Sequence, residues 1–588
     1  MEMDFSRSME PAVVLQDGSL ADGSRVRVLR SWENNCCRSK LVNDGLKTVQ
    51  IKEILLFSIE WLPPPGTTVY GEGYSKLSQY SGTPSSVKSI TPFSDGTHYK
   101  LPQAPEGNTV YNLLLAALPG QEHLLLSFAS CRRFGGQFRF SESRLDIVLD
   151  MEGLKLHPGE CWELEEFFHG RGGDRDGLLE QLAAVINKEH PRLAHTGVPM
   201  GWCSWYCYGP DIKTGDIIEN MEEIKRKLPG LSHIQIDDGY QPRMGDWLEP
   251  NAGMEGDIQS LCREIEKHGF EPAIWVAPFI AEEGSKLLKE HPDWFVGDGR
   301  GKPLRSDGVT YGGWRCGPWY MLDGSNPHTQ EHFKKIFRHM RVQWGCRYFK
   351  LDALMWGAIP AGSRFDEGTT CIEAYRRGMN AILEGAGEDS FILGCNAPMW
   401  PSLGRVHGMR VSGDIDRSWE SIRNIAREVF SRNWQHNRLW INDPDCIVLE
   451  NRKLWGEAVS RVTEEEFLFH AGTVLASGGM VLSGDRISNL SGAHVEKLRR
   501  LMAMPKKAAG FVDPDFRTGK IDMGDTLVLC LFNWEEEAVS REVALPGRYE
   551  VLDFWNNEPV GIFDGLFKIH EIKAHSSRIY ICNKLMKD

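Results

Sequence analysis

One order of segments repeats between residues 196 and 505: a short apolar run, a loop, and a stretch with helical spacing. In one such stretch, residues 257–269, Ile258, Leu261 and Ile265 form a single apolar stripe. Eight strand-then-helix units predict a (β/α)8 TIM barrel, an α/β fold, rather than an open doubly wound sheet, since no GxGxxG follows a strand. The expected strands are residues 201–209, 232–240, 271–279, 347–354, 391–398, 409–415, 439–445 and 479–485.

Segments of a different kind flank this repeat. Up to about residue 168, short apolar or alternating runs are separated by Gly, Pro, Asn and Asp, which is typical of an antiparallel β-sandwich. Residues 178–190 have helical spacing and are expected to form a connecting helix. We therefore predict an N-terminal β-sandwich with its connecting helix over 1–190, a catalytic barrel over 191–505 and a small C-terminal antiparallel β-domain over 506–588.

Charge and composition exclude several classes of function. The chain has 67 basic and 81 acidic residues, a net charge of −14, which argues against a nucleic-acid partner. The sequence has neither a signal-peptide pattern at its start nor a run of about 20 apolar residues, so we expect a cytoplasmic protein without a membrane partner. The 14 cysteines lack zinc spacing, and we interpret them as buried thiols and expect no metal or other cofactor. The oligomeric state stays open.

Polar residues stand at the ends of five predicted barrel strands, where a barrel builds its active site. A single Asp in such a place is more often a helix cap or a surface charge, but the set together favours a site. Because strand side chains alternate, Lys350 shares a face with Asp352, and Arg410 shares one with Asp414. The set comprises Asp237, Asp238, Lys350, Asp352, Cys395, Asn396, Arg410, Ser412, Asp414, Asp416, Asn442, Asp443 and Asp445.

Two carboxyls in one barrel mouth, one ionised and one protonated, are what glycoside hydrolysis requires. Many of the 19 tryptophans lie between residues 200 and 456, and aromatic rings pack well against the C–H faces of sugars. For each single ring, plain core filling is at least as good an explanation. The tryptophans therefore favour carbohydrate only jointly with the carboxylates.

The motifs GWCSWY, QIDDGYQ, WVAPF, YFKLDAL, GCNAP, RVSGDID and WINDPD, in this order, resemble glycoside hydrolase family 36. This is the family of the α-galactosidases, or melibiases, with the raffinose synthases as relatives. The resemblance covers the whole barrel and, more loosely, both flanking β-domains. It implies a retaining α-galactosidase that releases terminal α-galactosyl residues from a small oligosaccharide through a covalent glycosyl-enzyme intermediate.

The resemblance also implies roles for individual residues. Asp352 is the nucleophile and Asp414 the general acid and base, with Asp416 as a rival for the second role. Asp237 and Asp238 accept hydrogen bonds from the sugar 4- and 6-hydroxyls. Lys350 and Arg410 bind hydroxyls or orient carboxylates, and the walls and floor of the pocket are Trp205, Tyr206 and Trp275.

One departure from the family pattern keeps alternatives open. Cys395 and Asn396 stand where a smaller residue is expected, in a loop that helps to set what is tolerated at the sugar 2-position. A raffinose-synthase-like galactosyltransferase and an α-N-acetylgalactosaminidase therefore remain alternatives on the same machinery. A carbohydrate-binding protein on an inactive barrel is disfavoured because both acids are present. A magnesium enzyme of enolase type is disfavoured by the lysine and arginine beside the acids.

The long loop after the third strand, residues 280–330, contains Trp314, Cys316, Trp319 and Tyr320. We expect this loop and the N-terminal domain to contribute to the entrance of the site.

Overall fold

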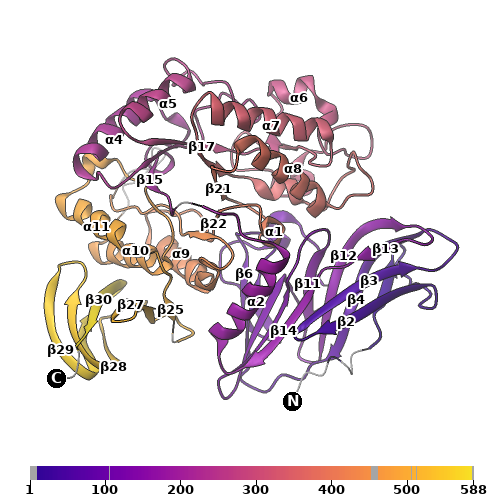
Figure 1. Cartoon of the computed structure of the whole chain (residues 1–588), viewed down its shortest axis with the longest axis horizontal. Helices are drawn as coiled ribbons and strands as arrows, with labels where there is room; N and C mark the ends of the chain where they lie inside the picture. Colours follow the sequence, from indigo (N-terminus) through magenta and orange to yellow (C-terminus); the bar gives the residue numbers. More distant parts are fainter. Residues whose placement is uncertain are drawn as a thin grey trace.

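The computed structural model describes the chain except residues 1–4, 6–8, 105, 196, 452–460, 505, 512 and 586–588. Figure 1 shows two antiparallel sheets at the N-terminal end, a parallel barrel in the middle and a small antiparallel sheet at the C-terminal end. The predicted fold class is confirmed in all three parts.

The N-terminal sheets pack face to face around a core that includes Phe57, Phe128 and Phe167. One sheet has the order β1 (Ala12–Leu15), β4 (Val49–Glu60), β12 (Arg144–Leu156), β11 (Gly135–Phe140), β8 (Asn108–Tyr111). The other has the order β13 (Cys161–Glu163), β3 (Cys36–Asn43), β14 (Phe167–Gly172), β10 (Glu122–Phe128), β9 (Leu113–Leu118), β5 (Thr68–Glu72), β6 (Gln79–Thr83), β7 (Ser86–Ser89), and β2 (Val26–Glu33) pairs with β3. A short helix, α1 (Asp95–Tyr99), and the connecting helix α2 (Arg175–Glu189) complete this part.

The barrel sheet is parallel throughout, in the order β23-β22-β21-β20-β17-β16-β15-β24. Its two outer strands are joined by hydrogen bonds from Met480 N to Asn442 O (3.0 Å) and from Ile447 N to Leu482 O (2.8 Å). All eight predicted strands are therefore confirmed. Their bounds are β15 (Met200–Cys203), β16 (His233–Ile236), β17 (Glu271–Val276), β20 (Tyr348–Leu351), β21 (Phe391–Gly394), β22 (Gly408–Arg410), β23 (Ile441–Asp443) and β24 (Val481–Ser483).

The helices around the barrel begin where the sequence provides caps. Thr370 and Glu373 form a capping box at the start of α8, and Thr463 and Glu466 do the same for α10. The predicted stripe of α5 is buried against the barrel. The helix bounds are α3 (Trp205–Tyr208), α4 (Thr214–Lys227), α5 (Ile258–Lys267), α6 (Lys286–Glu290), α7 (Pro327–Val342), α8 (Cys371–Ala386), α9 (Trp419–Ser431), α10 (Glu464–Ser477) and α11 (Gly492–Ala503).

The loop between β17 and α7 adds a two-stranded ribbon of β18 (Ile280–Ala281) and β19 (Tyr320–Met321). The C-terminal sheet has the order β25 (Gly510–Phe511), β26 (Thr518–Asp522), β27 (Thr526–Asn533), β30 (Ser576–Lys584), β28 (Val539–Asp553), β29 (Glu558–Ile572). Helix α10 packs against β30, so this sheet lies beside the barrel helices α9 and α10 (Figure 1). Within the described part of the chain, no helix has the length and apolar character needed to cross a membrane.

Candidate active site

The ends of β16 and β20 hold a buried ion pair. Lys350 Nζ donates to Asp237 Oδ2 at 2.9 Å, and the two side chains are only 5% and 2% exposed. Asp237 Oδ2 also accepts from Gln235 Nε2 (2.6 Å). Lys350 therefore binds the carboxylate of the neighbouring strand, although strand alternation places it on the same face as Asp352.

Asp238 is held by an arginine that the sequence did not single out. Arg315 donates from Nε to Asp238 Oδ2 (2.8 Å) and from Nη2 to Oδ1 (2.6 Å), a two-pronged contact with a side chain that is 2% exposed. Arg315 lies in the loop between β18 and β19, beside the Trp314 and Cys316 that had drawn attention. The sequence feature that could have indicated Arg315 is its place between Trp314 and Trp319, a cation among aromatic residues of this loop.

Asp352 follows β20, and both of its carboxylate oxygens accept N–H groups. Trp275 Nε1 donates to Oδ2 (3.1 Å), and the backbone N–H of Ala353 donates to Oδ1 (2.6 Å). Burial raises the pKa of Asp352 above its ordinary value; Lys350 opposes this rise and Asp414 adds to it. Trp275 is fully buried, with its ring edge-on to Trp247.

Asp414 follows β22 and is open to solvent, with 63% of its side chain exposed. Its Oδ1 accepts from Arg410 Nη1 (3.2 Å), and the same guanidinium binds Asp443 (2.9 Å) and Asp445 (2.8 Å). Tyr206 donates from its hydroxyl to Asp445. Arg410 is thus fixed by carboxylates from β23 and the turn after it, and presents one N–H to Asp414.

A lysine from the N-terminal domain reaches the same carboxyl. Lys76, which is 2% exposed, lies in the loop between β5 and β6; its Nζ is 3.8 Å from Asp414 Oδ1 and donates to Ser412 O at 2.9 Å. Its backbone N–H bonds to Ala397 O (2.9 Å) in the loop after β21. These contacts of Lys76 agree with the prediction that the N-terminal domain contributes to the entrance of the site.

The loop after β21 is also held from outside the barrel. Asn396 has a positive φ of 43° and accepts a hydrogen bond from the hydroxyl of Tyr99, the last residue of α1. Cys395 is 2% exposed, and burial, reinforced by Asp352, raises the pKa of its thiol to about 12. The thiol is therefore neutral beside Asp352 near neutral pH.

Two other predicted residues lie less centrally. Trp205 is half-buried and begins α3. Asp416, two residues beyond Asp414, is exposed, and its Oδ1 accepts the backbone N–H of Arg417 (2.7 Å). The carboxylate of Asp416 thus stabilises the turn before α9, whereas the carboxylate of Asp414 contacts Arg410 and Lys76.

The two candidate acids differ in electrostatic setting. Desolvation would raise the pKa of Asp414, but the charges of Lys76, Arg410 and Lys350 outweigh it and hold that pKa below its ordinary value. The pKa of Asp352 is shifted the other way. The pKa values of the two carboxyls are therefore shifted in opposite directions, while the two N–H bonds of Asp352 suit a carboxylate.

This arrangement defines a class. Carboxyls at the ends of β16, β20 and β22, with cations and buried indole rings around them at the carboxyl end of a (β/α)8 barrel, form the kind of site that glycoside hydrolases use.

Comparison with known proteins agrees with this class. The family model described as Melibiase matches residues 180–354. The bifunctional α-galactosidase/sucrose kinase AgaSK of Mediterraneibacter gnavus is 25% identical over 30% of this chain and 20% of its own length. The A type blood α-D-galactosamine galactosaminidase of Flavonifractor plautii is 28% identical over 26% of this chain and 13% of its own length. The chain thus spans a fifth or less of the length of these two curated relatives.

The resemblance extends much further in the fold. The crystal structure of the family 36 α-galactosidase AgaA from Geobacillus stearothermophilus superposes with a TM-score of 0.67 at 13% identity, covering 98% of this chain and 90% of that one. All three parts of the fold are therefore shared. The predicted resemblance to glycoside hydrolase family 36 is confirmed by the Melibiase family model, by the α-galactosidase relatives and by the shared fold.

Proposed function

We propose that this chain is a retaining α-galactosidase that hydrolyses terminal α-galactosyl residues of oligosaccharides. Asp352 attacks the anomeric carbon while the bond to the leaving oxygen breaks and Asp414 gives that oxygen its proton. Asp414 then takes a proton from water, and the water oxygen replaces Asp352 at the anomeric carbon. Two displacements retain the anomeric configuration.

One observation carries the proposal: Asp352 and Asp414 follow alternate strands of the barrel, and Asp352 is half-buried whereas Asp414 is exposed. Asp352 accepts N–H groups from Trp275 and Ala353, as a positioned nucleophile should. Asp414 is 63% exposed, where it can reach both a leaving group and water. The substrate class is supported by relatives such as AgaSK and AgaA, which are α-galactosidases.

Asp414 must carry a proton when the leaving group departs. A leaving-group oxygen at Asp414 accepts a hydrogen bond from the protonated acid, which favours that form. Asp352 must be ionised, and in the transition state its carboxylate stabilises the positive charge that develops at the anomeric carbon.

The sugar-recognition half of the proposal concerns Asp237 and Asp238. Lys350 and Arg315 hold the two side chains in place through ion pairs, and a carboxylate is a strong acceptor for sugar hydroxyls. An axial 4-hydroxyl that meets such an acceptor distinguishes galactose from glucose.

Hydrolysis of three aryl glycosides tests the proposal: the α-galactoside, the α-glucoside and the 2-acetamido-α-galactoside. We expect the α-galactoside to be preferred over the α-glucoside by at least about 10² in kcat/KM, because a site built for a hydroxyl rejects a sugar that lacks it there. Proton NMR of the first product should show the α-anomer. A β-anomer as first product would make the enzyme inverting, and equal cleavage of the glucoside would remove the assigned role of Asp237 and Asp238.

The second candidate is an α-N-acetylgalactosaminidase. A matching relative is named as an α-D-galactosamine galactosaminidase, whose sugar carries an amino group in place of the 2-hydroxyl, so this group of proteins includes a member for 2-substituted galactosides. In this proposal, buried Cys395 decides which substituent the site accepts at the sugar 2-position. Cys395 follows β21, the strand beside β20, and Asp352 follows β20. Preferential cleavage of the 2-acetamido substrate would select this candidate, and transfer of the galactosyl group to added sucrose would select the galactosyltransferase alternative.

A further inference from the structure

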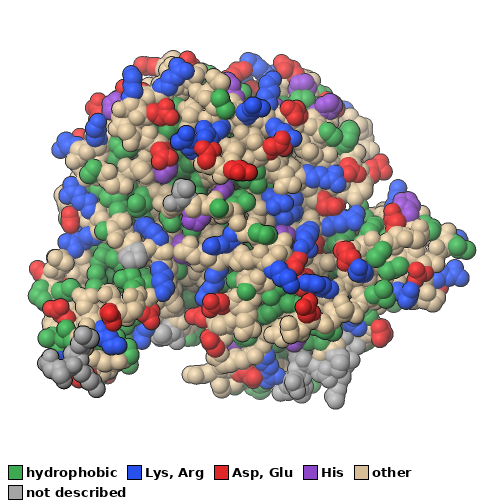
Figure 2. All heavy atoms as spheres, in the orientation of Figure 1, with side chains coloured by type: hydrophobic (Ala, Val, Ile, Leu, Met, Phe, Trp, Pro, Cys, Tyr) green, Lys and Arg blue, Asp and Glu red, His purple; other side chains and the backbone are tan. Residues whose placement is uncertain are grey.

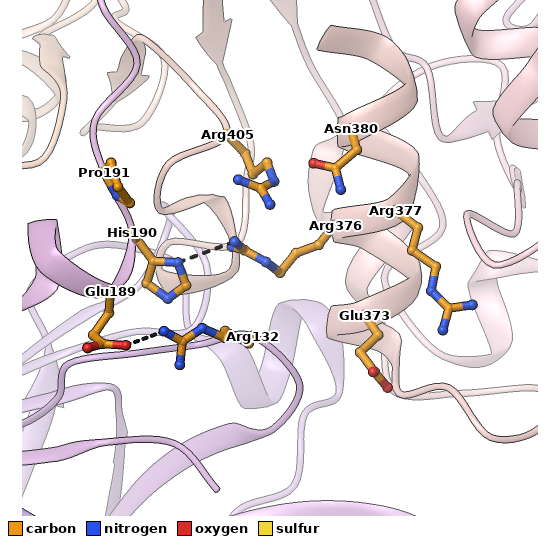
Figure 3. A pocket seen from close by; sticks show the side chains of 9 residues that line it. All are labelled: Arg132, Glu189, His190, Pro191, Glu373, Arg376, Arg377, Asn380 and Arg405. Carbon is orange, nitrogen blue, oxygen red and sulfur yellow. Dashed lines mark hydrogen bonds and ion pairs between the residues drawn. The ribbon is translucent and has the colours of Figure 1, made fainter. Parts of the chain in front are cut away.

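A cavity of about 420 Å³ lies between the N-terminal part and the outside of the barrel, away from the strand ends of the candidate active site (Figure 3). It is bounded by the end of α2, the helix α8 and the loop after β21. Figure 2 shows basic side chains, with acidic ones among them, on the face where α8 approaches the N-terminal sheets. The cavity is lined by Arg132, Glu189, His190, Pro191, Glu373, Arg376, Arg377, Asn380 and Arg405.

The acidic residues of this lining are already paired with other cations. Glu189 binds Arg132, and Glu373 binds Arg133 at 3.1 Å. Arg377 at the rim pairs with Asp366 at 2.7 Å. Among the described residues, no carboxylate forms an ion pair with Arg376 or Arg405.

Arg376 is nonetheless buried, and Arg405 is half-buried. Arg376 is 7% exposed, and its Nη1 donates to the backbone carbonyls of Pro401 (2.8 Å) and Leu403 (3.1 Å). Arg405 donates from Nη1 to Gly404 O (2.8 Å), while its buried Nε has no hydrogen-bond partner within the described part of the chain. Burial, and then the charge of Arg376, lowers the pKa of Arg405 to about 10. Burial lowers the pKa of Arg376, and Glu165 opposes this fall without forming an ion pair with it. A buried cation without an ion-paired carboxylate is costly, so the cavity favours an anion.

His190 adds a second, independent sign of a missing acceptor. Its Nε2 accepts the backbone N–H of Cys131 (3.0 Å), so the proton of the neutral ring sits on Nδ1. Burial lowers the pKa of His190 to about 2, which keeps the ring neutral. Nδ1 faces Nη2 of Arg376 at 3.3 Å, and arginine has only donors. Figure 3 marks this contact with a dashed line, and in the tautomer that the bond from Cys131 requires, neither of its two nitrogens is an acceptor.

We propose that this cavity binds a phosphate group, with Arg376, Arg405 and the Nδ1–H of His190 as donors to its oxygens. Phosphate offers several acceptor oxygens in the geometry that guanidinium groups recognise, and its charge offsets the two unpaired cations. The volume leaves room for an organic group beyond the phosphate. Because Arg376 also binds the loop after β21, which carries Cys395 and Asn396, an occupant would hold that loop in place.

Calorimetry at constant ionic strength tests this with three probes: inorganic phosphate, glycerol 3-phosphate and, as a control, chloride. We expect both phosphates to bind with a Kd at or below about 1 mM and to raise Tm, and chloride to do neither. Tighter binding of glycerol 3-phosphate identifies an organic ester as the ligand class, and equal or tighter binding of inorganic phosphate identifies the free ion. No binding of either phosphate up to about 20 mM overturns the proposal.

The variant Arg405→Met should weaken phosphate binding by about tenfold or more, since it removes a charged donor. Arg405 is the better choice because Arg376→Met also removes two bonds to the loop and could unfold it. The matched control is Arg347→Met, an exposed arginine paired with Asp389 on the outside of the barrel, which should bind phosphate as the wild type does. Unchanged phosphate affinity in Arg405→Met overturns the proposal. Loss of an oligomer in Arg405→Met, without phosphate binding by the wild type, would instead make the cavity a contact between copies of the chain.

Discussion

The candidate site has a floor and a cover that arise in different ways. The floor comes from the barrel strands and the residues that follow them, and consists of Asp237, Asp238, Lys350, Asp352, Arg410 and Asp414. The cover consists of Lys76, Tyr99 and Arg315, which come from the N-terminal domain and from the loop after β17. The floor provides the reacting groups, whereas the cover fixes their charge and position: Lys76 lies against Asp414, Tyr99 bonds to Asn396 and Arg315 clamps Asp238.

The largest effect should come from the floor. Asp352→Ala removes the nucleophile of the proposed mechanism, so kcat should fall by roughly 10⁴ or more with the fold retained. Added azide should restore part of the rate on an aryl galactoside with a good leaving group and give the β-configured galactosyl azide. Asp416→Ala is the matched control, because Asp416 is exposed and its carboxylate accepts the backbone N–H of the next residue, Arg417. Azide rescue in Asp414→Ala with that same inverted product would exchange the two roles.

The next effect concerns Asp414, the floor residue that the cover controls most directly. Asp414→Ala should slow oligosaccharide cleavage by about 10² to 10⁴, while an activated aryl or fluoride substrate still forms the glycosyl-enzyme, because a good leaving group needs no proton. The intermediate should accumulate and give a pre-steady-state burst, since water then lacks its base. A burst in Asp416→Ala and none in Asp414→Ala would assign the acid to Asp416.

The clamp between cover and floor can be tested by a double-mutant cycle. Arg315→Met and Asp238→Asn should each lower kcat/KM on an aryl galactoside by about 10², because each leaves a desolvated charged or polar partner. The double variant should be far less impaired than the product of the two effects, since the residues act through one contact. Multiplying effects would mean that Arg315 serves the substrate separately from Asp238.

The floor could be predicted from the sequence and the cover could not, for a physical reason. Buried parallel strands read as continuous apolar runs, and the polar residues that follow them meet at one end of a barrel. The partner of each side chain could not be predicted in this way. Strand alternation predicts that Lys350 and Asp352 share a face, yet the ammonium of Lys350 binds Asp237, which follows another strand, β16. No local sequence pattern predicts that Lys76 reaches the site. Its position depends on backbone hydrogen bonds between residues 74–76 and the loop of Ala397 and Met399, more than 300 residues away in the chain.

Removing the cover cation should change the pH profile more than the maximal rate. Lys76 lowers the pKa of Asp414, so Lys76→Met should raise it. If Asp414 is the general acid, the limb at high pH, where the acid loses its proton, moves to higher pH, and kcat at the optimum falls by less than about tenfold. The measurement is kcat/KM against pH for wild type and variant. Movement of the low-pH limb instead would mean that Asp414 works as an anion, and would support the exchanged roles.

The smallest expected effect is that of Tyr99→Phe, which removes one cover hydroxyl and keeps the ring. That hydroxyl donates to Asn396, whose positive φ places the loop after β21, and the ring remains packed edge-on to Trp356. Losing one neutral hydrogen bond costs about 1 kcal/mol, or roughly fivefold in an equilibrium. Because Asn396 follows Cys395 at the proposed 2-position, the loss should fall on KM and on discrimination between the galactoside and the 2-acetamido-galactoside, with kcat nearly unchanged. A fall in kcat alone would place the influence of Tyr99 on Asp352, whereas no change in either parameter would mean that the barrel loop holds its shape without the cover.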